Sequence, residues 1–402
     1  MSCRELLLNP DELSLKGRNQ KIFVDKLLLH VRAILKAYHP HRTTIVKDHH
    51  RHIVSSEADF TEETLRAFSF VPGLHSIHLV KSSPLDIDAA LELIKEDLPS
   101  PLPSKLSFKV KTTRPNKDFP MQSTDINRYL GHHLLKAYPE VLKVDVHNPE
   151  LLIHVKVLRK NIYVATKTIK SVGGLPVSSC GHALTLLSGG FDSPAASYLM
   201  FRRGIAQTYL FFHSYPFVGE EVYQKVLSLV RILTRYQPRT LLYVIPFGEI
   251  QKAIARDCKP AYRTLFFRHY MLCLATKICA KIKASAIITG DSLGQVASQT
   301  LPNISLLDNS TPLPILRPLI GYNKSEILNL ASTIGTHNIS ILPQDDACSL
   351  LADKHPATHP HLGYWNSFHA ENDFTPLLEN ALQGIRHTRV DWNGNIHEGH
   401  GF

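Results

Sequence analysis

The sequence lacks a long apolar run and any sign of a secretory leader. No stretch of about 18 consecutive apolar residues occurs among the 402 residues, so no membrane-spanning helix is predicted. The first residues, MSCRELLLNP, reach a charge at Arg4 and contain no small-residue cleavage site. We therefore expect a cytoplasmic protein without a membrane partner.

Cysteines are few and widely separated. The six cysteines include no C-x-x-C pair, which argues against a zinc or iron–sulfur site, and their dispersal argues against a disulfide framework. The 23 histidines are scattered and form neither an H-E-x-x-H motif nor a Cys/His cluster. No metal site is predicted from either residue type.

Acidic residues are scarce in one segment. Residues 101–170 hold 13 Lys and Arg but only 5 Asp and Glu, and so carry +8 of the chain's net charge of +10. Such a segment is typical of a polyanion-binding surface, because its charges neutralise phosphates and release counterions. No set of aromatic residues suited to base stacking accompanies it, which favours a folded, double-stranded shape as the ligand. A solvated basic face is the alternative.

The N-terminal 170 residues have the pattern of two small α/β units. Residues 19–38 repeat apolar side chains at helical spacing, and residues 86–98 and the stretch from Ser123 predict two more helices. Strands are predicted at 105–113, 151–159 and 161–169, where apolar and polar residues alternate as in a sheet with one exposed face. The strand 105–113 and the loop after it carry the basic residues Lys105, Lys109, Lys111, Arg114 and Lys117.

After a Gly/Ser/Pro-rich linker at 171–180 the chain alternates apolar strands with helices. Strands at 183–187, 206–214, 239–247 and 285–290 predict a parallel sheet with helices on both faces. The polar loops after the first and last of these strands are expected to meet at the carboxyl edge of the sheet, where such folds bind ligands. From about His361 the chain is rich in His, Asn and Gly, and we expect a docked tail or a partly disordered end.

The loop in LLSGGFDSPAAS, residues 186–197, has the chemistry of a phosphate site. Gly189 and Gly190 let backbone N–H groups approach an anion, and Pro194 suits the first turn of a helix whose N-terminus attracts negative charge. Ser188 and Ser193 can donate to phosphate oxygens. The lysine of the commoner phosphate loop is missing, which favours pyrophosphate as a leaving group over transfer of a terminal phosphoryl. An ordinary glycine-rich turn is the alternative.

This loop, SGGFDS, resembles the PP-loop of the ATP pyrophosphatases, which split ATP into AMP and pyrophosphate. Five further stretches extend the resemblance over essentially the whole chain: ELSLKGRNQKIF, FKVKTTRPNKDFPMQSTDINRYLG, GDSLGQVASQTLPN, PILRPLIGYNKSEI and ISILPQDDACSL. Together they are similar to the tRNA 4-thiouridine synthetase family, also called tRNA sulfurtransferase (ThiI).

The resemblance implies an α/β multidomain fold. Its parts are a ferredoxin-like domain at 1–75, a THUMP domain that docks on tRNA at 76–170, the linker at 171–180, and at 181–402 a PP-loop domain with a parallel sheet covered by helices. It also implies a reaction in which O4 of uridine 8 of tRNA is adenylylated by ATP with Mg²⁺. Sulfur then displaces AMP and gives 4-thiouridine.

Site residues follow from matching positions. The resemblance implies ATP contacts at Leu186, Leu187, Ser188, Gly189, Gly190, Asp192, Ser193, Arg268, Gly290 and Gln299. It and the basic segment imply tRNA contacts at Lys16, Arg18, Lys109, Lys111, Arg114 and Lys117. Without the resemblance, Arg268 would be interpreted as a helix-surface arginine and Gln299 as a helix cap.

Catalysis is expected from Asp192 and from Cys348, which matches the family's catalytic cysteine in a polar loop. Ala347 stands where some relatives have a second cysteine. Too few residues follow for a rhodanese domain, and Thr264 and Phe267 replace the C-x-x-C of iron–sulfur members, so no cluster is expected. We hypothesise that a separate cysteine desulfurase delivers the sulfur, and the family suggests a homodimer. Another PP-loop enzyme, of the 2-thiouridylase or amide-ligase type, and an inactive tRNA-binding protein are the alternatives.

Overall fold

The chain folds into two compact units in the computed structural model, residues 1–175 and 176–402. The structure describes residues 3–13, 19–48, 51–103, 105–343, 351, 353 and 355–402. Among these, no helix combines the length and the apolar character needed to cross a membrane.

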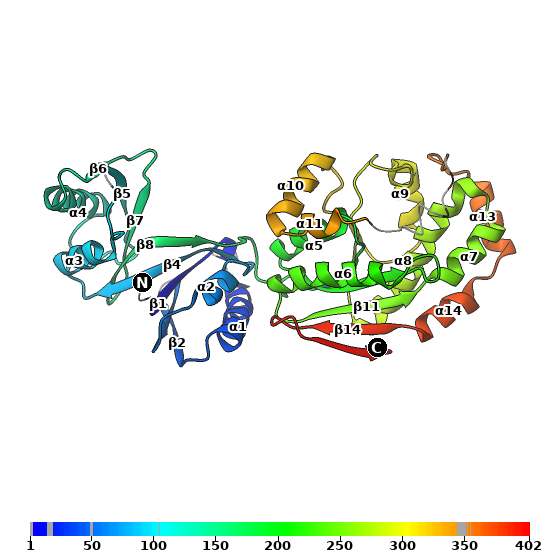
Figure 1. Ribbon diagram of the computed structural model, residues 1–402, viewed down its shortest axis with the longest axis horizontal. Helices are drawn as coiled ribbons and strands as arrows, with labels where there is room; N and C mark the ends of the chain where they lie inside the picture. Colours follow the sequence, from blue (N-terminus) through cyan, green and yellow to red (C-terminus); the bar gives the residue numbers. More distant parts are fainter. Residues whose placement is uncertain are drawn as a thin grey trace. The chain divides into compact units, whose positions relative to one another are not determined.

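The first unit is built on one eight-stranded sheet, in the order β2-β3-β1-β4-β8-β7-β5-β6 (Figure 1). β5 runs parallel to β6 and β7, and the other neighbours are antiparallel. The strands are β1 Glu5–Pro10, β2 Thr43–Asp48, β3 Arg51–Ser56, β4 Leu74–Ser83, β5 Leu106–Thr113, β6 Leu142–Val144, β7 Leu151–Val157 and β8 Ile162–Lys170. The helices are α1 Gln20–Tyr38, α2 Glu62–Phe68, α3 Ile87–Asp97 and α4 Ser123–Ala137.

Helical spacing explains how these helices cover the sheet. In α4 the side chains of Ile126, Leu130 and Leu134 recur every fourth residue and are buried with Phe108 and Val110 of β5. α1 likewise buries Leu27, Val31, Ile34 and Leu35, whereas Ile22 is 56% exposed because helical spacing places it on the opposite side of the helix.

β4 joins the two halves of this unit. It crosses residues 75 and 76, where the sequence analysis put a domain boundary, and it pairs with β1 on one side and β8 on the other. The ferredoxin-like and THUMP halves therefore share a continuous sheet. The exact domain bounds remain a prediction.

The second unit is a seven-stranded sheet in the order β13-β12-β9-β10-β11-β14-β15. The first five strands in this order are parallel to one another, as expected. β14 pairs antiparallel with β11, and β15 pairs antiparallel with β14. The strands are β9 His182–Leu186, β10 Ala206–His213, β11 Thr240–Pro246, β12 Ile287–Ile288, β13 Ile315–Leu316, β14 Arg386–Val390 and β15 Ile396–His400.

Helices cover both faces of this sheet (Figure 1). α5 Asp192–Arg202, α6 Glu220–Leu233, α10 Lys324–Ile334 and α11 His337–Ser340 lie together on one side. On the other side, α7 Gly248–Asp257, α8 Arg263–Ile282 and α14 Thr375–Gln383 pack on a core that includes Leu184, Leu210 and Ile245. The remaining helices are α9 Leu301–Asp308, α13 Leu362–Glu371 and the short 3₁₀ turns η2 Thr234–Tyr236, η3 Pro260–Tyr262 and η4 Ala297–Gln299.

The C-terminal stretch is the docked tail that was one of the two expectations, and not a partly disordered end. From His361 onward it forms α13, α14, β14 and β15, and β14 pairs with β11. The ring of Trp365 stacks on Phe266 of α8 at 4.5 Å, and Phe368 is 2% exposed. These few buried aromatic side chains pack the segment against the domain. The average composition of the segment is polar, and it does not indicate that individual aromatic residues are buried.

Strand order determines where a ligand can bind. The chain enters at β9, moves outward through β10 and β11, and returns to the opposite side of β9 with β12. Strand order therefore reverses between β9 and β12, and a crevice forms outside the carboxyl ends of parallel strands at such a point. The loops after these two strands are the ones that the sequence analysis singled out.

Candidate active site

The loop between β9 and α5 is closed by its own serines. β9 ends at Leu186, and α5 begins at Asp192. The backbone N–H of Ser188 donates to Ser193 Oγ at 2.9 Å, and the two hydroxyl oxygens are 3.1 Å apart. Ser193 is buried in the first turn of α5. These bonds fold residues 188–193 over the N-terminus of α5, where unsatisfied N–H groups favour an anion.

The loop after β12 presses directly on this turn. A Cβ atom at Gly290 would lie 2.8 Å from the backbone N of Ser193 and from the carbonyl C of Asp192. Only glycine fits this approach without movement of the backbone. The contact brings the motifs SGGFDS and GDSLGQ together from residues about one hundred positions apart.

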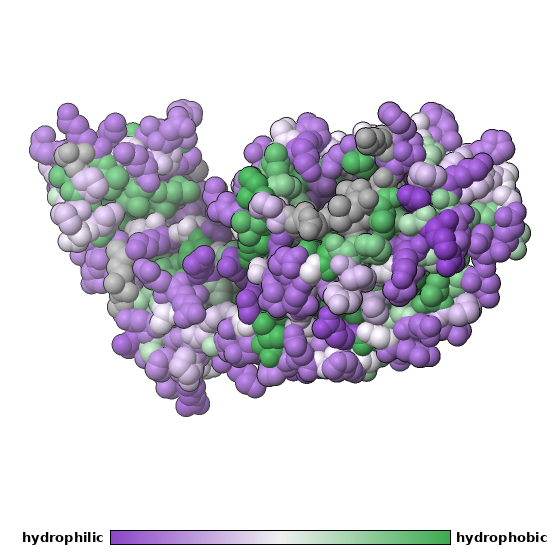
Figure 2. Space-filling view, turned by 45° about the vertical axis from the view of Figure 1, so that its right-hand side comes forward, coloured by the Kyte–Doolittle hydropathy of each residue, from purple (hydrophilic) through white to green (hydrophobic). Residues whose placement is uncertain are grey.

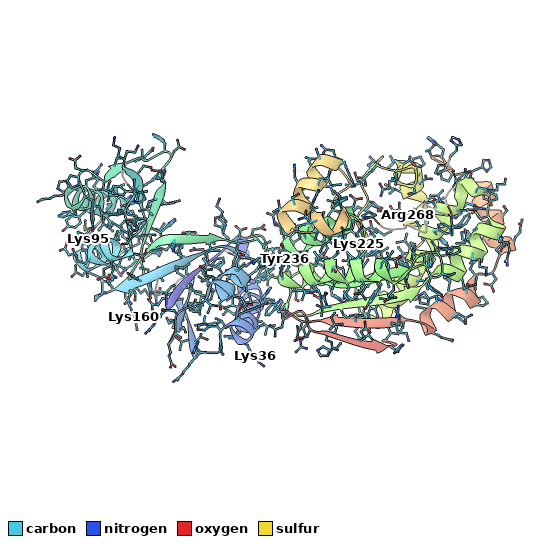
Figure 3. All side chains as sticks on the ribbon, in the orientation of Figure 1. Lys36, Lys95, Lys160, Lys225, Tyr236 and Arg268 are labelled. Carbon is cyan, nitrogen blue, oxygen red and sulfur yellow. The ribbon has the colours of Figure 1, made fainter. Side chains whose placement is uncertain are left out.

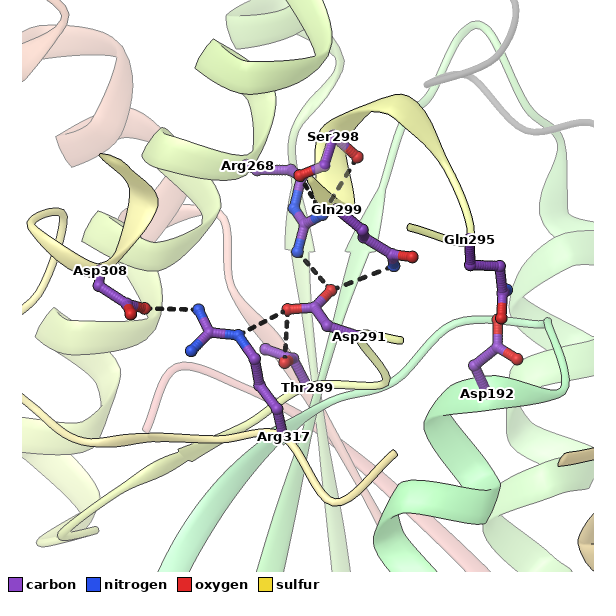
Figure 4. A network of polar contacts seen from close by, with 9 residues as sticks. All are labelled: Asp192, Arg268, Thr289, Asp291, Gln295, Ser298, Gln299, Asp308 and Arg317. Atoms are coloured by element: carbon purple, nitrogen blue, oxygen red, sulfur yellow. Dashed lines mark hydrogen bonds and ion pairs between the residues drawn. The ribbon is translucent and has the colours of Figure 1, made fainter. Parts of the chain in front are cut away.

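Asp291 organises the polar side of the site (Figure 4). It forms ion pairs with Arg268 and, at 3.2 Å, with Arg317. Thr289 Oγ1 and Gln299 Nε2 donate to it at 2.8 and 3.3 Å. Burial by itself would raise the pKa of Asp291, but Arg268, Thr289 and Arg317 together hold that pKa below its usual value. Asp291 is therefore an anion that fixes Arg268 and Gln299.

A lysine from another motif stands beside the loop. Lys324, the first residue of α10, donates to Asp192 Oδ1 at 3.0 Å, and Gln295 Nε2 donates to Asp192 Oδ2 at 2.9 Å. Asn323 caps α10 in a capping box with Glu326, which holds Lys324 at the helix start. The structure thus supplies from α10 the cation that the loop sequence lacks.

A cavity of about 510 Å³ lies between these groups. Its volume is in the range of small-molecule sites. Its apolar wall comprises Leu186, Leu187, Phe211, Phe212, Val218, Val222, Met271 and Val296. Its polar wall includes Ser188, Asp192, Ser193, Arg268, Asp291, Ser298 and Gln299. An apolar half beside a phosphate-type loop suits a nucleoside triphosphate.

The structure brings together nine of the ten residues predicted to contact ATP. The tenth, Gly190, does not line the cavity, and its carbonyl accepts a bond from Ser340 Oγ at 3.0 Å. The site also contains three residues that were not predicted from the sequence: Asp291, Arg317 and Lys324. All three lie in quoted motifs, and an ionisable residue directly after a strand, as at Asp291, was the signal that could have found the first.

The residues predicted to contact tRNA differ in how exposed their side chains are and in what they bind. Lys111 and Lys117 are exposed, and Lys109 Nζ donates to the carbonyl of Val146 at 2.7 Å. Arg114 donates to the carbonyls of Asn116, Lys117 and Phe119, so it holds its own loop in shape. Lys16 and Arg18 lie outside the described residues. Contact of the six residues with tRNA stays a prediction.

The thiol predicted to carry sulfur, Cys348, also lies outside the described residues. Among the described cysteines, burial raises the pKa of Cys3, Cys258 and Cys273 to about 11 and that of Cys279 to about 12. Such groups are protonated thiols at neutral pH and are poor nucleophiles. Cys279 is buried in the core, whereas the Sγ of the partly buried Cys273 lies 3.5 Å from His269 Nε2.

In the part of the chain that the structure describes, no group of three or more His, Cys, Asp or Glu could hold a metal ion. The reversal of strand order, the loop over the N-terminus of α5 and the half-apolar cavity define a nucleotide-binding α/β domain of the PP-loop type. In the sequence this domain follows the first unit, whose strand β5 is basic.

Comparisons with known proteins agree with this assignment of a PP-loop domain. The family described as Thiamine biosynthesis protein (ThiI) matches residues 178–371, the THUMP domain matches 87–167, and the ThiI ferredoxin-like domain matches 5–78. A "Probable tRNA sulfurtransferase" of Moorella thermoacetica is 41% identical over 97% of this chain and 99% of its own length. One of Halothermothrix orenii is 38% identical over 94% and 96%. The chain belongs to the ThiI family of tRNA sulfurtransferases.

Solved structures extend the comparison. The crystal structure of a 4-thiouridine synthetase–RNA complex with bound ATP matches with a TM-score of 0.85 and 28% identity, over 97% of this chain and all of that one. PH1313 from Pyrococcus horikoshii matches with a TM-score of 0.63 and 20% identity, over 83% and 99%, which supports the fold alone. The expected fold class and family are confirmed.

Proposed function

We propose that this chain is an ATP-dependent tRNA sulfurtransferase that converts uridine 8 of tRNA to 4-thiouridine in the cytoplasm. The observation that carries the proposal is the cavity of about 510 Å³ at the reversal of strand order, where the loop over α5, Arg268 and Gln299 face one space. Family membership supports tRNA as the acceptor and sulfur as the transferred atom.

The first step is adenylylation. The uridine O4 attacks the α-phosphorus of ATP, the bond from that phosphorus to the bridging oxygen breaks, and pyrophosphate leaves. The N–H groups of the loop and of the α5 N-terminus bind the negative charge of the leaving group, and Lys324 adds a cation beside them. The adenine packs in the apolar half of the cavity.

Magnesium enters this scheme with the triphosphate, whose oxygens are suitable ligands. Asp192 is the carboxylate of the loop, and both of its oxygens accept hydrogen bonds, from Lys324 and Gln295. Its primary task is therefore to position the loop against α10 and the loop after β12. The proposal requires no iron–sulfur cluster.

The second step is sulfur transfer by Cys348. A cysteine desulfurase supplies a persulfide on this thiol, and its terminal sulfur attacks C4 of the adenylylated base. The C4–O4 bond breaks, and AMP leaves with O4. A reducing thiol then attacks the Cys348 sulfur, which forms a disulfide with Cys348 and frees the other sulfur as 4-thiouridine.

The test follows both steps in the same variants. Transfer RNA is incubated with the protein, Mg-ATP, a cysteine desulfurase and cysteine, and we measure pyrophosphate release and the near-ultraviolet absorbance of 4-thiouridine. Asp192→Ala and Lys324→Met are expected to lose both signals, and Cys348→Ser to lose only 4-thiouridine. Lys277→Met, at an exposed lysine of α8, is the matched control and retains both.

Other outcomes assign other functions. Full 4-thiouridine production by Cys348→Ser would reject the thiol as the sulfur carrier. Pyrophosphate exchange without tRNA would identify a ligase for a small molecule. Binding of tRNA without any product from the wild type would identify an inactive binder or a different target base.

A further inference from the structure

A buried lysine outside the nucleotide cavity holds the chain just ahead of the Cys348 segment. Lys225 lies on α6 (Figure 3). Its side chain is buried, with the residue only 8% exposed, and its ammonium donates to the carbonyls of Ser340 at 3.0 Å and Leu342 at 2.6 Å. Ser340 is the last residue of α11, where helix carbonyls lack partners within the helix. Lys225 therefore fixes the exit of α11.

The same exit is bonded to the phosphate-type loop. Ser340 Oγ donates to the carbonyl of Gly190 at 3.0 Å. On α6, Val222 lines the cavity, and Lys225 lies three residues further along the helix. The wall of the cavity is thus connected through α6 and the bonds of Lys225 to residues 340–342, and Ser340 connects these residues to the loop at Gly190.

Holding two carbonyls with a buried ammonium is costly. Burial lowers the pKa of Lys225, and in the described part of the chain no carboxylate pairs with it. The ammonium loses hydration on burial, and its two described acceptors are neutral carbonyls, which replace that hydration only in part. Removal of the ammonium would leave the carbonyls of Ser340 and Leu342 without this donor, so the two bonds stabilise the exit of α11.

We propose that Lys225 is a positioning residue for sulfur transfer: it fixes residues 340–342 against the ATP loop and so determines where the Cys348 segment begins. The inference rests on the proposed function, because it takes Cys348 as the sulfur carrier. Lys225 touches neither nucleotide nor base in this scheme. Its role is to direct the thiol to a base that has already been adenylylated.

The experiment separates the two steps in a single turnover. The full-length variants Lys225→Met and Lys225→Arg are compared with the wild type and with Lys252→Met, which changes an exposed lysine of α7. Each is preloaded with persulfide and mixed with tRNA and Mg-ATP. Samples are quenched, treated with a reducing thiol that frees 4-thiouridine from the Cys348 disulfide, and assayed for pyrophosphate and 4-thiouridine. Lys225→Met is expected to release pyrophosphate near the wild-type rate but to form 4-thiouridine about 100-fold more slowly, as a small misplacement of reacting groups can cause.

The conservative variant and the control complete the test. Lys225→Arg retains donors for both carbonyls and is expected to recover part of the sulfur-transfer rate, while Lys252→Met matches the wild type. Equal loss of both steps in Lys225→Met, or wild-type sulfur transfer, overturns the proposal. If Lys225→Met does not fold, Ser340→Ala is measured in the same way, and unchanged sulfur transfer there overturns it.

Cys348→Ser, run in parallel, separates this inference from the proposed function. If Cys348→Ser forms no 4-thiouridine and Lys225→Met is fully active, only the role of Lys225 fails. If Cys348→Ser still forms 4-thiouridine, the thiol is not the carrier, and both proposals fail.

Discussion

Asp291 shows how a single buried charge organises a site. It is 5% exposed and stays ionised because Arg268 and Arg317 compensate for the hydration that it loses. Arg317 also donates to Asp308 at 2.5 Å, which keeps that guanidinium turned toward the network. From the sequence by itself, Arg268 would be interpreted as a helix-surface residue. The carboxylate of Asp291 holds it on the cavity wall.

We expect Asp291→Asn to lower the free energy of unfolding by about 3 kcal/mol, because removal of one partner leaves buried charges uncompensated. Since folding lowers the pKa of Asp291, its charge stabilises the domain at neutral pH, and this contribution is lost as pH falls through the folded-state pKa. The variant should therefore lose less stability on acidification than the wild type. Urea unfolding at several pH values measures both effects.

Asp308→Asn is the matched control. The side chain of Asp308 is 49% exposed and binds only Arg317 of the two arginines, so the expected loss is below about 1 kcal/mol. Equal losses for the two variants would show that Asp291 is not the centre of the network.

At the scale of elements, the site depends on how closely two loops approach. The loop after β12 reaches the first turn of α5 at Gly290, and the short β12 is placed there by pairing with β9 and β13. Neither loop contains the whole site. Their contact converts two separate motifs into one surface for the triphosphate.

We expect Gly290→Ala to weaken ATP binding at least about 10-fold, because the added Cβ forces the backbone of Asp192 and Ser193 to move. Gly321→Ala is the control, since a Cβ there has open space and no positive φ. Isothermal titration with ATP compares the two variants. Wild-type affinity in Gly290→Ala would mean that the loop accommodates the methyl group and that the close approach is unimportant.

At the scale of the whole molecule, the nucleotide cavity and the basic strand belong to different units. The described residues that line the cavity, from Leu186 to Pro356, all belong to the second unit. The basic strand β5 belongs to the first. Both units carry hydrophobic patches on a mainly hydrophilic surface (Figure 2). The exposed hydrophobic side chains include Leu293, Val296 and Leu301, which follow β12 in the sequence.

We expect residues 176–402, expressed alone, to fold and to bind ATP with an affinity close to that of the full chain. The same fragment is expected to lose most of its affinity for tRNA, and residues 1–175 alone are expected to bind tRNA with an affinity that falls as salt increases. ATP titration and filter binding at two salt concentrations test this. Loss of ATP binding by the fragment would show that the first unit contributes to the nucleotide site.

The sequence by itself determined the class of fold, the phosphate loop, the basic segment and the family. These depend on local features: the period of apolar residues, glycine and serine in one turn, and motifs that are contiguous in the chain. Only the tertiary structure decided that Lys324 faces Asp192, that Asp291 holds Arg268 and that Lys225 anchors the exit of α11. Each of these contacts joins residues far apart in sequence, and a pattern along the chain does not record which distant side chains the strand order brings together.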